Sequence, residues 1–86
     1  MLYPHADRIL TDDRAALRAA DRECRAANAD LTDAIADWQT STGPDRGAAR
    51  DVLRACLAEA RDCRVAAMLA AARLNLTCRG IAAGRV

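Results

Sequence analysis

Phenylalanine is absent from this 86-residue chain, and Tyr3 and Trp38 are its only aromatic residues. Alanine dominates the 52% of residues that are hydrophobic. An alanine methyl removes far less surface from water than a leucine side chain, so at about 25 cal/mol per Å² its burial contributes little free energy. A chain of this length forms a single domain, residues 1–86, near the smallest size that one core stabilises alone. The composition therefore predicts a thin core that a partner supplements.

Catalytic and metal-binding residue types are also scarce. His5 is the only histidine, Glu23 and Glu59 are the only glutamates, and the four cysteines form no Cys-x-x-Cys pair. The chain has no Glu-x-x-His motif, which excludes a ferritin-like half-bundle, and Ser41 has no base near it in the sequence. We predict a protein that is not an enzyme and binds no cofactor.

Long apolar runs and one-sided charge are missing as well. Residues 65–72 form an apolar run that Arg64 and Arg73 bracket, and it is shorter than the about 18 residues of a membrane span. The first seven residues lack the basic and apolar regions of a signal peptide. The net charge is +1, and acidic and basic residues are interspersed, which favours neither nucleic acid nor a membrane as partner. We expect a cytoplasmic protein. Its bias towards Arg, Asp and Ala fits a GC-rich bacterial genome and predicts no function.

What the sequence does contain is a seven-residue repeat. An apolar residue recurs at every seventh position from Leu10 to Trp38, and small residues follow three positions after the middle three members; the two series are Leu10, Leu17, Cys24, Leu31 and Trp38, and Ala20, Ala27 and Ala34. A repeat sustained in this way is typical of a helix with a narrow apolar stripe that packs against another helix. We predict a first helix over residues 5–40.

A second stripe follows a break at residues 41–44, which read Ser-Thr-Gly-Pro. Its members step alternately by four and three: Ala49, Leu53, Cys56, Ala60, Cys63, Ala67, Ala70 and Leu74. The pattern predicts a second helix over residues 45–79. Gly80 is expected to end it in the left-handed conformation, and residues 80–86 form a tail. The predicted fold is all-α, a long antiparallel two-helix hairpin of the coiled-coil type.

The short turn also fixes which residues face each other. Pairs whose residue numbers sum to about 87 share a layer in an antiparallel hairpin of this register. Leu31 then meets Cys56, Cys24 meets Cys63, and Leu17 meets Ala70. Most layers join one large and one small residue, which favours close packing of the helices.

The second helix has more apolar surface than one partner helix covers. Val65, Leu69, Ala72 and Leu76 form a further stripe on a different face. A second copy of the chain would cover it and complete a four-helix bundle as a homodimer. The alternative is a monomer whose own N-terminal residues Leu2, Tyr3 and Ile9 cover the stripe.

The four cysteines allow one further set of predictions. Three of them, Cys56, Cys63 and Cys78, lie too far apart along one helix to be bridged. Only Cys24 and Cys63 are placed for an intrachain disulfide. Small buried hydrophobic side chains in a reducing cytosol are one interpretation of Cys24, Cys56 and Cys63. Binding of a soft metal, Cu(I) or Zn, is the other, although a seven-residue spacing is wide for a metal pair.

Two functional hypotheses follow. The first is a non-enzymatic helical interaction module that self-associates through the second helix and docks onto a protein partner as an adaptor, inhibitor or assembly subunit. The second is a metal or redox protein that uses the thiols of Cys24, Cys56 and Cys63 inside the bundle.

Overall fold

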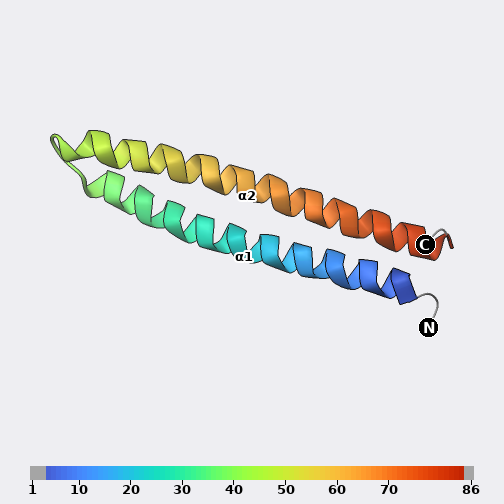
Figure 1. Ribbon diagram of the computed structural model, residues 1–86. Coiled ribbons are helices and arrows are strands. Elements are labelled where there is room, and N and C mark those ends of the chain that lie inside the picture. Colours follow the sequence, from blue (N-terminus) through green and yellow to red (C-terminus); the bar gives the residue numbers. More distant parts are fainter. Residues whose placement is uncertain (1–3, 85–86) are drawn as a thin grey trace.

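The computed structural model describes residues 4–84 of the chain, with side chains from His5 onward, and these residues form a hairpin of two helices. Helix α1 spans Pro4–Thr40 and helix α2 spans Asp45–Ala82. The helices lie side by side and antiparallel, with the turn at one end and the start of α1 and the end of α2 at the other (Figure 1). The molecule is a rod of 64 × 15 × 12 Å. The prediction of an all-α two-helix hairpin is confirmed.

The turn forms where the sequence predicts it. Gly43 adopts a positive φ of 61°, which a residue without Cβ reaches at little cost, and its carbonyl accepts a hydrogen bond from the Arg46 N–H at 3.2 Å. The hydroxyls of Thr40 and Ser41 donate to the Asp37 carbonyl. They satisfy a carbonyl of the last turn of α1 that has no partner within the helix. Trp38 lies at this end, where the Arg46 guanidinium stacks 4.6 Å from the centre of its ring.

The predicted end of the second helix is wrong by one turn. The helix continues through Gly80 to Ala82, and Gly84, with φ 73°, is the glycine in the left-handed conformation. The N–H of Ala83 donates to the Arg79 carbonyl at 3.0 Å and closes the last turn. Gly80 is buried inside the helix, although glycine costs about 1 kcal/mol relative to alanine at such a position.

The start of the first helix agrees with the prediction to one residue, since α1 begins at Pro4 and Thr11 lies inside it. Leu2 and Tyr3, which the monomer alternative uses to cover the outer stripe, lie outside the described residues, as do residues 85 and 86. Ile9 lies on α1, and 37% of it is exposed.

The core of the hairpin is made of alanine. The apolar residues buried in the interface are Ala6, Ala27, Ala34 and Ala60. Larger members of the two stripes are only half-buried at its edges; they include Leu10, Leu17, Leu31, Leu53 and Leu74. Because small residues occupy the centre, the two backbones approach closely and the large side chains lie across the flanks. This layering explains why the hairpin buries no large side chain fully within its described part.

Contacts across the interface agree with the predicted register. Asp13 of α1 pairs with Arg73 and Thr77 of α2, and Trp38 contacts Arg46. The residue numbers of these three pairs add up to 86, 90 and 84. Each sum lies within about one helical turn of 87, a distance that long side chains can span.

Candidate protein interaction face

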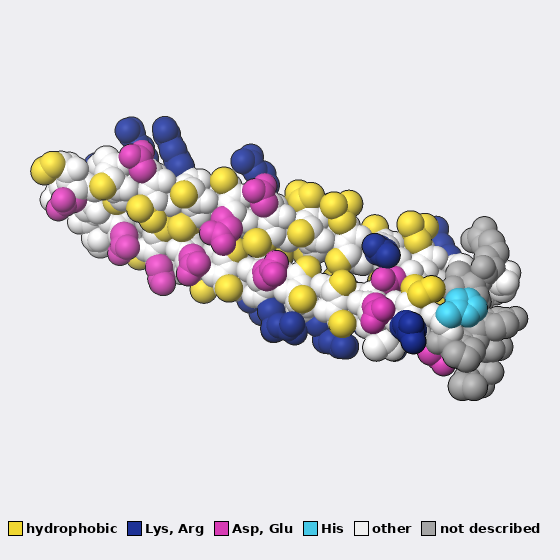
Figure 2. Space-filling model, in the orientation of Figure 1, with side chains coloured by type: hydrophobic (Ala, Val, Ile, Leu, Met, Phe, Trp, Pro, Cys, Tyr) yellow, Lys and Arg dark blue, Asp and Glu magenta, His cyan; other side chains and the backbone are white. Residues whose placement is uncertain are grey.

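One side of α2 exposes a group of large apolar side chains. The group comprises the predicted stripe together with Met68, and we call it the outward face: Val65, Met68, Leu69, Ala72 and Leu76. Leu69 and Leu76 are each 66% exposed, and Met68 is 65% exposed. In Figure 2 the hydrophobic side chains stand out along the upper edge of the C-terminal half of α2. No side chain of the described hairpin covers them.

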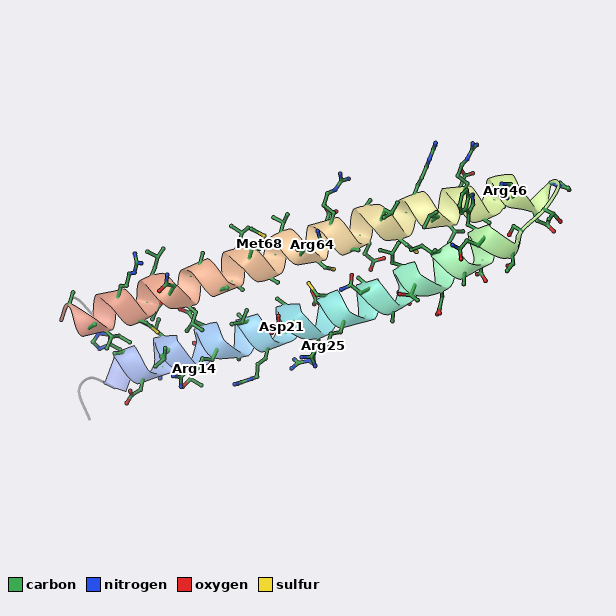
Figure 3. All side chains as sticks on the ribbon, turned by 180° about the vertical axis from the view of Figure 1, so that it is seen from behind. Arg14, Asp21, Arg25, Arg46, Arg64 and Met68 are labelled. Atoms are coloured by element: carbon green, nitrogen blue, oxygen red, sulfur yellow. The ribbon has the colours of Figure 1, made fainter. Side chains whose placement is uncertain are left out.

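The helical repeat explains why α1 leaves this face open. Val65 lies five positions after the interface residue Ala60, and Leu69 lies two positions after the interface residue Ala67. At 3.6 residues per turn, such positions point about 150° away from the side of α2 that contacts α1. Figure 3 shows Met68 on the side of α2 that faces away from α1. A partner on the outward face would therefore contact α2 without touching the α1 interface.

Met68 was not among the predicted stripe residues. It precedes Leu69 in the apolar run 65–72 and adds its side chain to the edge of the stripe. Its flexible thioether adapts to varied surfaces, which makes methionine common at protein interaction sites. The apolar run itself was the signal that could have included it.

The three predicted cysteines occupy the helix interface. Cys24, Cys56 and Cys63 are half-buried, Cys78 is exposed, and all four are free thiols. The pKa of the Cys63 thiol is raised above its usual value, first by burial and then by Cys24, with smaller contributions from nearby carboxylates. The influence of Cys24 agrees with the prediction that the two thiols share a layer. A raised pKa keeps Cys63 protonated at neutral pH, whereas the thiolate is the form that attacks disulfides and binds metal.

Mild oxidation is expected to join Cys24 and Cys63 within one chain. Because the raised pKa of Cys63 postpones loss of its proton to higher pH, the link should form faster at about pH 9 than at about pH 7. Peptide mapping by mass spectrometry after timed oxidation measures both rates.

A different product of this oxidation would contradict the register. A disulfide from Cys24 to Cys56 within one chain would shift the pairing of the helices by seven residues. Leu31 would then lie beside Ala49 instead of Cys56, and Leu17 beside Cys63 instead of Ala70.

A buried carboxylate lies in the interface near the open end of the hairpin. Asp13 is 6% exposed. Thr77 donates its hydroxyl hydrogen bond to the Asp13 carboxylate, and Arg73 Nε lies 3.3 Å from Asp13 Oδ1. The position was visible in the sequence, because Asp13 stands midway between Ala6 and Ala20 in the series of small residues. The sequence analysis did not place it there, because a carboxylate is costly to bury unless it is paired.

Replacing Asp13 by alanine is expected to change the free energy of unfolding by less than about 1 kcal/mol, because alanine continues the small-residue series and removes a charge that resists burial. The variant Arg73→Ala/Thr77→Val keeps the carboxylate but removes both partners. It should lose about 2 kcal/mol or more, since an unpaired charge is then buried. Urea unfolding followed by circular dichroism at one protein concentration makes the comparison. The opposite order of the two losses would contradict this account of Asp13.

No cluster of three or more metal-ligating side chains occurs within the described residues. Helix α2 is long and apolar enough, by length and composition, to cross a membrane, because one 18-residue window has a mean hydropathy of 1.2. The apolar run 65–72 considered above is shorter than this window. A single helix of this kind is weak evidence for a membrane span, since the buried core helix of a soluble protein passes the same test; here 6% of the window is buried inside the hairpin.

The described chain is thus an all-α hairpin with an alanine interface on one side of α2 and an exposed apolar face on the other. Comparisons with protein-family models, with curated proteins and with solved structures give no match.

Proposed function

We propose that this protein is a non-enzymatic interaction module that forms a homodimer through the outward face of α2. The dimer then docks onto a larger protein as an adaptor, inhibitor or assembly subunit. One observation carries the proposal: most of the large apolar side chains that the hairpin exposes along the C-terminal half of α2 gather on one face. Contiguous apolar surface of this kind marks interaction sites in soluble proteins.

The thin core supports the same proposal. Alanine forms the buried part of the α1 and α2 interface, so burial within one hairpin contributes little free energy per residue. A two-helix chain of this size gains stability by association. Covering the outward face would bury four large side chains from each chain in addition to the alanines.

The direction of the outward face also favours a particular arrangement of the four helices. In a square bundle each helix contacts its two neighbours on faces about 90° apart, whereas here the two faces of α2 point about 150° apart. We therefore propose a layered dimer in which the two α2 helices pair at the centre and each α1 lies on the outside. This proposal replaces the four-helix bundle expected from the sequence with a row of four helices.

The alternative, a soft-metal or redox protein, draws support from the shared layer of Cys24 and Cys63. The raised pKa of Cys63 counts against it, because the protonated thiol is a poor metal ligand and nucleophile. Cys56 lies seven residues from Cys63, two helical turns along α2, which is wide for ligands of one metal ion. The geometry therefore supports the interaction module better.

Sedimentation equilibrium tests the proposal on the unmodified chain. At micromolar concentration, under reducing conditions and with a chelator present, we expect twice the mass of one chain. A chain that remains monomeric up to several hundred micromolar would remove the basis for the proposal.

A further inference from the structure

The outward face has a charged residue at each end. Asp62 precedes Val65 by three positions, and Arg79 follows Leu76 by three positions. Both are exposed. Together they extend the stripe into a regular series with steps of three, four, three, four and three: Asp62, Val65, Leu69, Ala72, Leu76 and Arg79. This series has the spacing of a helix interface, and it lies on the side of α2 away from α1.

The series also has a property that a copy of itself can use. The steps of the series are the same when it is read backwards. An antiparallel copy can therefore lie against it with every position paired, the two-fold axis passing between Leu69 and Ala72. Because the two ends carry opposite charges, this pairing places each Asp62 beside an Arg79 of the other copy. A two-fold symmetric dimer requires this self-complementarity, because both partners present the same surface.

We propose that two copies of this chain pair antiparallel along α2, with Asp62 of each chain beside the partner's Arg79. This inference rests on the proposed function and specifies its partner and register. Leu69 packs against the partner's Ala72, and Val65 packs against the partner's Leu76. The central layers again join large to small residues, as close packing of helices requires.

Neighbouring registers fit the same residues less well. A shift of seven residues in one direction places Leu69 against the partner's Arg79. The opposite shift places Asp62 against the partner's Ala72. Each leaves a charge at the apolar centre without an opposite charge. A parallel pair aligned in register would place Asp62 beside the partner's Asp62 and Arg79 beside the partner's Arg79, where like charges repel.

The residues that flank the series agree with the antiparallel register. Arg73 faces the partner's Ala66, and Arg61 faces the partner's Ala82. No two flanking side chains of like charge come together. Arg73 meanwhile pairs with Asp13 of its own chain, which directs its guanidinium towards α1 and away from the dimer interface.

Charge reversal tests the register. Asp62→Arg alone places a basic side chain beside the partner's Arg79 twice in each homodimer, and Arg79→Asp alone places two acidic side chains together twice. Each single variant should therefore dimerise less tightly than the unmodified chain. A mixture of the two variants restores opposite charges at both contacts, so the heterodimer should be favoured over either homodimer by about tenfold or more at low ionic strength. Native mass spectrometry of the mixture, with one variant labelled with ¹⁵N, counts the three species.

A matched pair of variants controls for net charge. Asp51→Arg and Arg54→Asp make the same exchanges of charge elsewhere on α2. In the proposed register these two positions face no residue of the partner's α2, which ends at Ala82. Their mixture should give a statistical distribution of dimers. Circular dichroism verifies that all four variants remain helical.

Two failures are distinguishable. If the unmodified chain dimerises but the mixture of Asp62→Arg and Arg79→Asp is statistical, the register is wrong and the proposed self-association stands. If the unmodified chain does not dimerise, the proposed function fails with the register. Preferential heterodimers in the test pair, with a statistical control pair, would support the register.

Discussion

The double variant Leu69→Glu/Leu76→Glu is expected to be a monomer with intact helices. Both side chains are 66% exposed in the hairpin, so glutamate, a good helix former, costs the single chain little. In the dimer each change removes about 1.5 to 3 kcal/mol of apolar burial, and each occurs twice. The Kd of the dimer should therefore increase by more than about 1,000-fold. Sedimentation velocity over a dilution series measures the change, and circular dichroism follows the helices.

Leu57→Glu is the matched control for this variant. Leu57 lies on the same helix and is 50% exposed, but its position points between the outward face and α1. It should leave the dimer affinity within a few-fold of the unmodified value. A Leu69→Glu/Leu76→Glu chain that still dimerises as tightly as Leu57→Glu would show that the outward face is not the contact.

The second large effect is expected in the alanine interface. Ala27 is 3% exposed and Ala60 is 4% exposed, and the register places them in one layer. Leucine at position 27 adds three carbons at a buried position between the two helices. Overpacking of this kind costs about 1 to 3 kcal/mol, a large part of the stability of a small domain. Thermal unfolding by circular dichroism should show a midpoint lowered by about 10 °C or more.

Ala29→Leu provides the comparison. Ala29 is exposed on the same helix, so leucine there leaves the distance between the helices unchanged. Its midpoint should remain within a few degrees of the unmodified protein. Equal losses in Ala27→Leu and Ala29→Leu would mean that the helices do not pack through a central row of alanines.

Much of the fold could be predicted because a seven-residue period constrains a helix over its whole length. Leu10 and Trp38 belong to one series, so the phase at one end fixes the phase at the other. The Gly43 turn is short, which leaves the hairpin little choice of register. These are the features on which sequence and structure agree.

The sequence prediction was wrong at one position and incomplete at another. Gly80 suggested a helix end because of its low helix propensity, but α2 continues through it to Ala82, and Gly84 adopts the left-handed conformation. Asp13 was not predicted in the interface, although its place midway between Ala6 and Ala20 puts it in the series of small residues, and Arg73 and Thr77 pair with its buried carboxylate. The repeat therefore carried the position of Asp13, but it did not carry the end of α2.

The position of the outward face could be predicted as well, because helical spacing assigns Val65 and Leu76 to a side of α2 that α1 does not reach. The sequence indicates less directly which molecule covers this face, since an apolar surface attracts many partners. The charges of Asp62 and Arg79 favour a second copy of the chain, because a copy complements both charges, whereas an unrelated helix does so only by coincidence.

Photochemical crosslinking from Met68 tests the central claim most directly. Met68 and Met1 are the only methionines, so a diazirine analogue of methionine enters the outward face with little change in shape. The labelled chain is mixed with unmodified ¹⁵N chain, irradiated and digested with trypsin. We expect Met68 of one chain to be joined to the ¹⁵N peptides 65–73 and 74–79 of α2. Crosslinks from Met68 that stay within one chain, or that reach only α1 of the other chain, would contradict a dimer formed through this face.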